Sequence, residues 1–209
     1  MGQIHLELFA TLDLVAQSPG HPGEDPEGFA FGGWQAPLIT RTTGAQVVAA
    51  YEGTDALLLG RRTYDVFAAY WPHQRELDDA PGIATLFNRV PKYVASRGAP
   101  DLSWAGARQL GPDLPAAVRE VRARHERVQV VGSLDLVQTL LRHRLVDRLN
   151  LWLHPIVLGA GKKVFAGGAV PAALVLREPP VADERGTVLL RYDVTGAVPA
   201  TGDMRAPGR

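Results

Sequence analysis

Three short stretches of the sequence each contain at least two of glycine, a hydroxyl-bearing residue and arginine, which suit the binding of an anion. They occupy residues 60–63, 96–97 and 132–133, and each follows a short apolar run. Glycine lets a ligand approach the backbone closely, and the planar fork of an arginine can bond two phosphate oxygens at once. A glycine after a strand is often only part of a turn, so each stretch alone leaves that alternative open. Together the stretches favour a phosphorylated cofactor.

The stretch "VQVVGS" shows how the backbone would contribute to such a site. An apolar strand pattern ends at Gly132, and Ser133 precedes a helical pattern. A strand that turns into a helix at this point presents unpaired backbone N–H groups, with their partial positive charge, at the end of a sheet. Ser133 is also a favoured N-cap residue. The first stretch has the same construction and adds side-chain cations and a hydroxyl group: Gly60, Arg61, Arg62 and Thr63.

Ser96 and Arg97 form the third candidate. They stand at the end of the apolar run "KYVAS", which has the pattern of a strand. Open α/β sheets bind their ligands at the carboxyl ends of the strands. This pair is therefore placed where a ligand would be expected.

The elements that must position these residues alternate between strand and helix. Period-2 or continuous apolar runs predict strands, and apolar residues three and four apart predict helices. The predicted strands cover residues 4–10, 56–60, 92–96 and 128–132, and further β-structure covers 148–159 and 172–194. The predicted helices cover residues 37–51, opened by Pro37, then 61–70, 113–125 and 134–145. This alternation predicts an α/β fold with a mostly parallel central sheet and a C-terminal antiparallel hairpin.

Two segments lack any such periodicity. Residues 17–36 are rich in proline and glycine and end in aromatic residues, Phe29, Phe31 and Trp34. This segment is either an ordinary surface loop or a lid over a binding site, since long irregular loops in compact domains are often functional and aromatic rings suit a flat ligand. Residues 196–209 have a composition typical of disorder. We therefore expect one domain over residues 1–195, with a loop insertion at 17–36, and a tail at 196–209.

Composition excludes several classes of protein. The 209 residues include 22 Lys plus Arg and 22 Asp plus Glu, so no excess of positive charge is available to coat a nucleic acid or an anionic membrane. The lack of cysteine excludes disulfides, thiolate zinc sites and a cysteine nucleophile. The six histidines are scattered, which makes a metal site improbable. With no long apolar run, we expect a cytoplasmic protein.

Four longer stretches, in their order along the chain, resemble a known family. "LLLGRRTYD", "YVASR", "VVGSLDLVQTLL" and "RLVDRLNLWLHPIVLGAGKKVF" are similar to successive signatures of the dihydrofolate-reductase fold. The similarity is greater to the branch related to the reductase domain of the bifunctional riboflavin-biosynthesis deaminase-reductase. It extends from the first strand to about residue 194 and implies a three-layer fold with a mixed central sheet.

The resemblance also implies an NADPH-dependent reductase and a role for each of the three stretches. Residues 60–63 would hold the pyrophosphate of the cofactor and reach toward its 2'-phosphate. Ser96 and Arg97 would bind the adenosine 2'-phosphate. The turn formed by Gly132, Ser133 and Leu134 would close on the pyrophosphate and pass near the nicotinamide. NADP(H) is thus expected in preference to NAD(H).

Departures from the family pattern limit the possible substrates. Folate reductases carry a carboxylate on their first helix, whereas residues 37–51 contain no Asp or Glu. Folate is therefore an improbable substrate, and the lack of cysteine excludes the zinc deaminase activity. Asp13 stands at the end of the first strand, where this fold keeps its substrate, although an Asp in this position is often only a turn residue. We take Asp13 as the candidate catalytic residue, with Phe31 and Trp34 as further candidates for substrate contact.

The expected reaction is hydride transfer to a small, electron-poor heterocycle, similar to a pterin or a pyrimidinedione, or to a conjugated carbonyl. Two other classes of function remain open. One is a non-catalytic protein that binds NADP, and the other is a structural dimer module whose site has decayed. A homodimer is expected in any case, because the apolar strands after residue 148 would leave an exposed sheet edge and because the family branch commonly pairs through this part of the fold.

Overall fold

The computed structural model describes residues 2–74, 82–167 and 169–205. Its helices are α1 (Arg41–Tyr51), α2 (Arg61–Tyr70), α3 (Ile83–Arg89), α4 (Leu114–Arg124) and α5 (Leu134–Arg142), with short 3-10 helices η1 (Ala36–Leu38) and η2 (Trp71–His73). The strands are β1 (Gln3–Thr11), β2 (Ala56–Gly60), β3 (Lys92–Ala95), β4 (Ala107–Gln109), β5 (Arg127–Val130), β6 (Arg148–His154), β7 (Leu174–Leu176), β8 (Val181–Ala182) and β9 (Val188–Val194).

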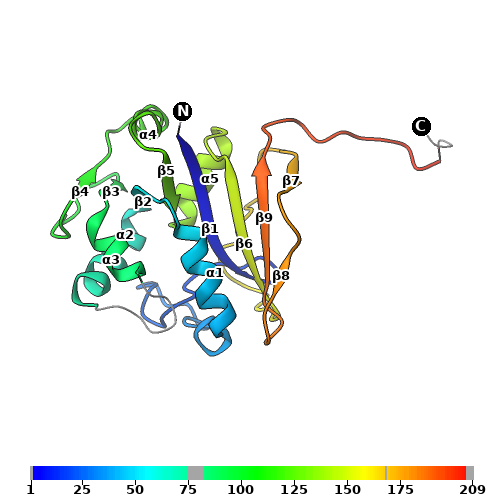
Figure 1. Cartoon of the computed structure of the whole chain (residues 1–209), viewed down its shortest axis with the longest axis horizontal. Coiled ribbons are helices and arrows are strands. Elements are labelled where there is room, and N and C mark those ends of the chain that lie inside the picture. The colour runs from blue at the N-terminus through cyan, green and yellow to red at the C-terminus, as the bar shows by residue number, and fades with distance from the viewer. Residues whose placement is uncertain (1, 75–81, 168, 206–209) are drawn as a thin grey trace.

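One sheet organises the described part of the chain (Figure 1). The strand order is β4-β3-β2-β5-β1-β6-β9-β7, and β8 pairs with β9. The strands from β4 to β6 in this order are parallel, whereas β9 runs antiparallel to β6, β7 and β8. The predicted α/β fold, its mostly parallel sheet and its antiparallel C-terminal end are confirmed.

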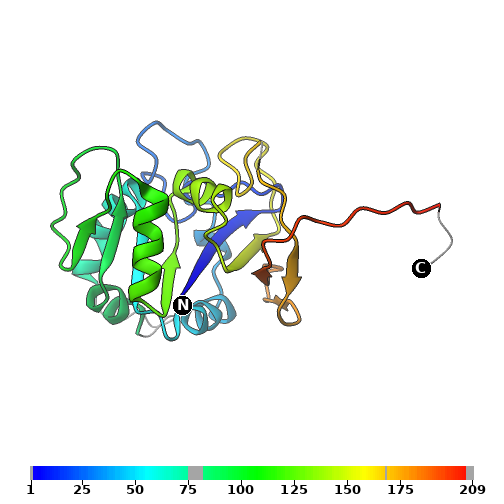
Figure 2. The same cartoon turned by 90° about the horizontal axis from the view of Figure 1, so that it is seen from above.

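Helices cover both faces of the sheet and produce three layers (Figure 2). On one face, α4 and α5 pack on alternate residues of β1, among them Ile4, Leu6 and Leu8. On the other face, α1, α2 and α3 pack on residues of β2 and β3, among them Leu57 and Val94. Strand β2 is buried throughout because both of its faces are covered. The sheet therefore presents only its edges and the ends of its strands to ligands.

Some element boundaries differ from those predicted. Pro37 lies in η1, and α1 begins only at Arg41, because the Thr40 side chain accepts a hydrogen bond from the Thr43 backbone N–H at 3.1 Å and caps the helix there. Strand β4 and helix α3 were not predicted. Strand β4 lies at the edge of the sheet with mostly exposed residues and has no clear apolar period, and α3 has only seven residues.

A carboxylate, Glu7, lies fully buried in β1 beneath α1. Its oxygens accept hydrogen bonds from the side chains of Asn150 at 2.7 Å, Gln129 at 3.2 Å and Trp152. Burial raises the pKa of Glu7 to about 7, against the opposing effect of these donors. Among the described residues, the Gln129 and Asn150 side-chain carbonyl oxygens have no hydrogen-bond partner. We call these four side chains the Glu7 cluster.

The described residues of the tail, 196–205, form no helix or strand. In both views this segment extends away from the body of the molecule after β9 (Figures 1 and 2).

Candidate functional site

Two strand-to-helix turns meet at the carboxyl edge of the sheet. The β2–α2 turn contains Gly60, and the β5–α5 turn contains Gly132 and Ser133; the Gly60 N–H donates to the Gly132 carbonyl at 2.9 Å. A Cβ atom on Gly60 would lie 2.2 Å from Ser133 Oγ, and one on Gly132 would lie 2.7 Å from Thr63 Oγ1. The peptide bond between Gly132 and Ser133 is cis. Glycine is thus required at position 60, where a Cβ would also lie 2.7 Å from the Ser133 backbone nitrogen, whereas at position 132 the close atom is a side-chain hydroxyl.

The helices that begin at these turns have open N-termini. Neither α2, with Gly60 at its N-cap, nor α5, with Ser133, has a side-chain hydrogen bond at the cap. In contrast, α1 is capped by Thr40, and α4 is capped by Asp113, which accepts from the Ala116 N–H at 3.1 Å. The first N–H groups of α2 and α5 are therefore left for a ligand, together with the positive ends of two helix dipoles.

A groove of about 740 Å³ lies along this edge, in front of both turns. The structure brings together most of the residues predicted to bind the cofactor, since the following line the groove: Gly60, Arg61, Arg62, Ser96, Arg97 and Ser133. Gln109 on β4 supports one wall, because its side chain donates to the Gly98 carbonyl at 2.6 Å and to the Ser96 carbonyl at 3.3 Å. The short turn after β3 is held in place by these bonds.

The arginines of the groove differ in their partners. Arg61 pairs with Asp65 one turn along α2. Arg62 pairs with Glu27 and has Asp25 at 3.8 Å, so it connects α2 to the loop at 17–36. Arg97 is exposed and forms no ion pair or side-chain hydrogen bond with any residue in the described ranges. Of the three, Arg97 is thus the most available cation for an incoming anion.

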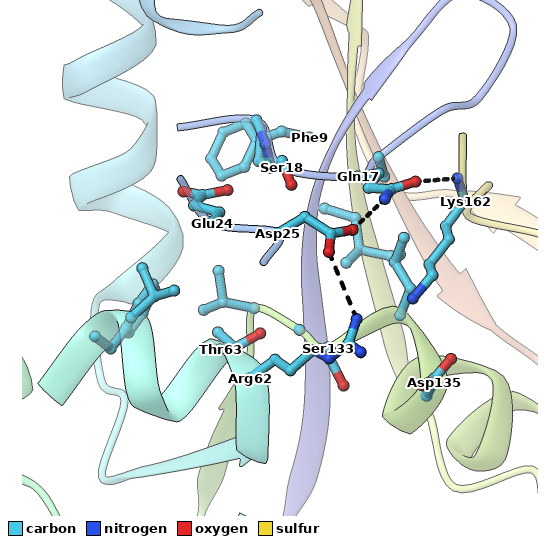
Figure 3. A pocket seen from close by; sticks show the side chains of 18 residues that line it. Phe9, Gln17, Ser18, Glu24, Asp25, Arg62, Thr63, Ser133, Asp135 and Lys162 are labelled. Atoms are coloured by element: carbon cyan, nitrogen blue, oxygen red, sulfur yellow. Dashed lines mark hydrogen bonds and ion pairs between the residues drawn. The ribbon is translucent and has the colours of Figure 1, made fainter. Parts of the chain in front are cut away.

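A smaller cavity of about 150 Å³ adjoins the groove, and Arg62 and Ser133 line both (Figure 3). The remaining predicted cofactor residues, Thr63, Gly132 and Leu134, line this small cavity. Apolar walls come from β1 and α2, including Phe9 and Phe67. The small cavity thus continues the groove into a more apolar space between the sheet, α2 and α5.

The loop at 17–36 forms one side of the small cavity. Gln17, Ser18, Pro19, Glu24 and Asp25 line it. The loop is closed on itself, because the Gly33 N–H donates to the Ser18 carbonyl at 2.8 Å and the Gln35 N–H donates to the Pro19 carbonyl at 3.0 Å. Its position over a cavity agrees with the lid interpretation.

The aromatic residues of the loop have other positions than those predicted. Phe31 is 48% exposed and packs edge-on against Phe29, with ring centroids 5.9 Å apart. Trp34 is buried, and its indole N–H donates to the Gln17 carbonyl at 2.9 Å, while its ring packs edge-on against His154. Neither Phe31 nor Trp34 lines the groove or the small cavity. Trp34 anchors the loop instead, because its large apolar ring is buried against the body of the protein while its N–H bonds to the loop backbone.

Asp13 also lies outside both cavities. Its carboxylate accepts hydrogen bonds from Thr11 Oγ1 at 2.6 Å, the Leu158 N–H at 3.2 Å and the Gly159 N–H at 2.9 Å. The bond from Thr11, followed by those backbone bonds, holds the pKa of Asp13 below its usual value. These contacts fit the alternative in which Asp13 is a turn residue, and a lowered pKa is the opposite of what a proton donor requires.

Several other polar groups that line the small cavity were not predicted from the sequence. Asp25 is buried and accepts hydrogen bonds from the Glu27 N–H at 2.9 Å and from the Gln17 side chain, which keep its pKa below the usual value. Lys162 lies in the stretch "LGAGKK", for which the sequence predicts no role in the site, and its side chain lines the cavity from the opposite side (Figure 3). The signal that was available is the cluster of acidic residues in "GEDPEG", beside loop glycines.

Neither a metal-binding cluster nor a membrane-spanning helix is present in the described ranges. No three His, Asp or Glu side chains there gather in an arrangement that could hold a metal ion. No helix of this part of the chain combines the length and apolar character needed to cross a bilayer.

The strand order, the covered faces and the groove at the carboxyl edge define a three-layer, dihydrofolate-reductase-like α/β domain. Within that class the chain belongs to the RibD C-terminal domain family, whose model matches residues 3–182. A curated relative, the uncharacterized protein YyaP of Bacillus subtilis strain 168, is 28% identical over 112 residues, an alignment that covers 53% of this chain and 59% of that protein.

Solved structures share the fold at low sequence identity. A putative riboflavin biosynthesis protein from Shewanella sp. PV-4 superposes with a TM-score of 0.69 at 16% identity, covering 93% of this chain and 99% of that one. A pyrimidine reductase-like protein from Corynebacterium diphtheriae has a TM-score of 0.64 at 14% identity, covering 92% of each chain. RibD of Acinetobacter baumannii has a TM-score of 0.57 at 16% identity, and this chain covers 58% of its length.

Proposed function

We propose that this chain is an NADPH-dependent reductase that transfers hydride to a small heterocycle similar to a pterin or a pyrimidinedione. The observation that carries the proposal is the groove of about 740 Å³, where two helices with open N-termini meet three arginines. Membership of the RibD C-terminal domain family and the fold shared with a pyrimidine reductase-like protein support the same reaction class. The volume lies within the range of about 300–1,000 Å³ typical of ligand sites.

The groups in the groove fit a phosphorylated dinucleotide. The uncapped N–H groups of α2 and α5 suit a pyrophosphate, which requires several donors over a short distance. Ser96 and Arg97 suit a phosphomonoester, because Arg97 is free to form a two-pronged contact and Ser96 supplies a hydroxyl. Thr63 and Leu134 line the small cavity and would flank the nicotinamide. The cofactor, when bound, supplies the hydride.

The protein's own contribution is placement and the exclusion of water. Phe9 and Phe67 give the small cavity apolar walls, and the loop at 17–36 covers it. Holding donor and acceptor in contact in a dry space supplies much of the acceleration in reactions of this kind. Gln17, Asp25 and Lys162 offer hydrogen bonds and charge to orient a polar heterocycle against the cofactor.

A titration and a turnover assay test this function. In a titration followed by the quenching of protein fluorescence, NADPH is expected to bind with higher affinity than NADH. In a turnover assay with a panel of pterins, pyrimidinediones and quinones, at least one compound is expected to support NADPH oxidation. Equal affinity for the two nucleotides would contradict the assignment of the groove. Binding without turnover of any acceptor would favour the non-catalytic alternative, and lack of binding would favour the structural alternative.

A second copy of the chain is proposed as a partner. Leu174, Val175 and Leu176 form β7, which ends the sheet, and all three are exposed. An exposed apolar edge strand commonly pairs with another chain. Light scattering at micromolar concentration is expected to give about twice the chain mass of 22.5 kDa. A mass near that of one chain would contradict the dimer, and a Val175→Lys variant is expected to reduce the mass to that of one chain.

A further inference from the structure

We propose that Glu24 is the acid that delivers the proton to the substrate when hydride is transferred, an inference that rests on the function proposed above. Reduction of a C=N or C=O bond requires a proton as well as a hydride. Asp13 lies outside the cavities, so the proton must come from another acid or from an ordered water. The small cavity is lined by two neighbouring carboxyl groups, Glu24 and Asp25, and the structure gives them different surroundings.

Asp25 is committed to contacts that stabilise its charge. Figure 3 shows its carboxylate directed toward Gln17 and Arg62, with Arg62 Nη1 at 3.8 Å. The Glu27 N–H adds a hydrogen bond at 2.9 Å. These donors and the nearby cation favour the ionised form. Asp25 is therefore suited to hold a donor group of the substrate and unsuited to release a proton.

Glu24 takes part in none of those contacts. Its side chain is half-buried and lines the same cavity as Phe9 and Phe67. Burial raises the pKa of Glu24, and backbone hydrogen bonds from Gly20 and His21 oppose this effect only partly. A pair of carboxyl groups whose surroundings push their pKa values apart is the arrangement in which one acts as an acid while the other stays ionised.

The other charged groups at this cavity come from α2, α5, the turn that holds Lys162 and the loop at 17–36, whereas β1 contributes only apolar residues. Arg62 projects from α2, Asp135 from α5 and Lys162 from the turn before residue 163, while His21 lies next to Glu24 on the loop. Arg62 is paired with Glu27 and lies near Asp25, so its charge is largely compensated within the loop. Glu24 has no ion pair in the described structure, which leaves burial as the main influence on it.

Hydride adds to the carbon of the C=N or C=O bond with two electrons, and the electron pair of the double bond moves to the nitrogen or oxygen. That atom takes the proton from the Glu24 carboxyl group. In total the substrate gains one hydride, which carries two electrons, and one proton, while the nicotinamide is oxidised by two electrons. The Glu24 carboxylate recovers a proton from solvent water when the product leaves.

Glu24→Gln is the variant that tests this role, because it keeps the size of the side chain and removes the acid. We expect turnover to fall roughly 100-fold or more, while the dissociation constant for NADPH stays within about twofold of the wild type. In the wild type, turnover should decline as pH rises above the pKa of Glu24, since only the protonated form donates. The variant should lose that decline. Glu120→Gln, the same change at an exposed residue of α4, should leave both measurements unaltered.

A readout independent of turnover comes from NMR titration of side-chain carboxyl groups in protein labelled with ¹³C-glutamate. Glu24 should titrate above the ordinary value of about 4.3 for glutamate, with its resonance assigned by its loss in Glu24→Gln. Glu7 also titrates late and is assigned separately by Glu7→Gln. An ordinary pKa for Glu24 would overturn the proposal.

A second variant guards against a folding defect in the first. Glu24→Ala leaves space in the cavity, and added formate is expected to restore part of its turnover. If the wild type turns over and Glu24→Gln turns over equally fast, this inference alone is contradicted. The same holds if the wild type turns over and formate restores no turnover to Glu24→Ala. Absence of turnover in the wild type, with NADPH bound, would remove the proposed function and the inference with it.

Discussion

Two regions of the molecule concentrate polar groups, and they use them differently. In the Glu7 cluster beneath α1, the carboxylate accepts its hydrogen bonds from side chains of the same sheet, and Glu7 is fully buried. At the carboxyl edge, the N-termini of α2 and α5 have no side-chain caps and Arg97 has no ion pair in the described ranges. The first region is closed by its own partners, whereas the second leaves donors and cations for a ligand.

This difference shows that an unusual pKa alone does not identify a functional group. Burial raises the pKa of both Glu7 and Glu24, but only Glu24 lines a cavity. Perturbed titration accompanies structural networks as well as active sites, so access to a ligand must decide between them. We therefore expect variants of the closed region to change stability and variants of the open edge to change binding or turnover.

The largest expected effect is on the free energy of unfolding of the protein, and it comes from the Glu7 cluster. The folded pKa of Glu7 is about 7, raised from 4.5, so the folded state binds this proton more tightly than the unfolded state. The free energy of unfolding should thus fall by roughly 3 kcal/mol as pH rises from about 4.5 to 7 and then stay level. Glu7→Gln should remove this loss, since an amide does not titrate. The new amide can also donate to the free carbonyl oxygen of Gln129 or Asn150.

Urea unfolding at intervals from pH 5 to 8 measures this effect, with Glu120→Gln as the matched surface control. If the unfolding free energy of Glu7→Gln depends on pH as that of the wild type does, Glu7 is not the group responsible for the pH dependence. Loss of NADPH binding in this variant would break the division between the two regions.

The next largest effect is expected at the open edge. Arg97→Ala removes the exposed cation beside Ser96, and its contact with a phosphate is worth about 1.5–3 kcal/mol. Affinity for NADPH should therefore fall by roughly tenfold to 150-fold, while affinity for NADH and the stability of the fold stay the same. Fluorescence titration with both nucleotides measures the change. A variant that retains the full preference for NADPH would show that the 2'-phosphate binds elsewhere.

A substitution where the β2–α2 and β5–α5 turns meet should affect both the stability of the fold and the binding of NADPH. The Cβ of Gly60→Ala would lie 2.7 Å from the Ser133 backbone nitrogen, so the turns must separate. Overpacking of this kind costs roughly 1–3 kcal/mol of stability and should also weaken NADPH binding. Gly167→Ala is the matched control, because its Cβ would meet no atom within 4 Å. Thermal unfolding and nucleotide titration together check the result, and an unaltered Gly60→Ala protein would argue against the close approach.

The smallest effect is expected at the junction between the loop and the groove. Glu27→Gln removes the exposed partner of Arg62, and ion pairs of this type contribute about 0–1 kcal/mol. Freed from Glu27, Arg62 should bind a phosphate more readily, which raises NADPH affinity up to about fivefold. The gain should shrink at high salt. Weaker NADPH binding in this variant would indicate that Glu27 itself supports the bound state.

Sequence patterns predicted the fold and the groove because each depends on local runs of residues. "ALLLGRRT" and "VVGS" each contain a strand end, a glycine and the first helical residues, so the parallel sheet alone brings them to one edge. Strand β4 escaped prediction because three partly exposed residues carry no period. The antiparallel end of the sheet was predictable from the alternation of apolar residues in 148–194.

The small cavity was less predictable because its contacts join distant parts of the chain. Asp25 approaches Arg62 across the fold, and Lys162 reaches the same space from a turn after β6. Aromatic residues suggested a role in ligand contact, but Trp34 satisfies its N–H within the loop and Phe31 faces solvent. Local composition does not determine which side of an irregular loop faces inward, since that depends on the hydrogen bonds that close the loop.

The central place of β1 has a consequence for the order in which the protein is made. His5 of β1 pairs with Gln129 of β5 and with Arg148 of β6, so its partners leave the ribosome more than a hundred residues later. At about 5–20 residues per second, β1 waits roughly 7–30 s before both neighbours exist. During that time the apolar residues Ile4, Leu6 and Leu8 have no sheet to join. Chaperones should therefore bind β1 in the nascent chain, and β1 should join the sheet only once β6 has been synthesised.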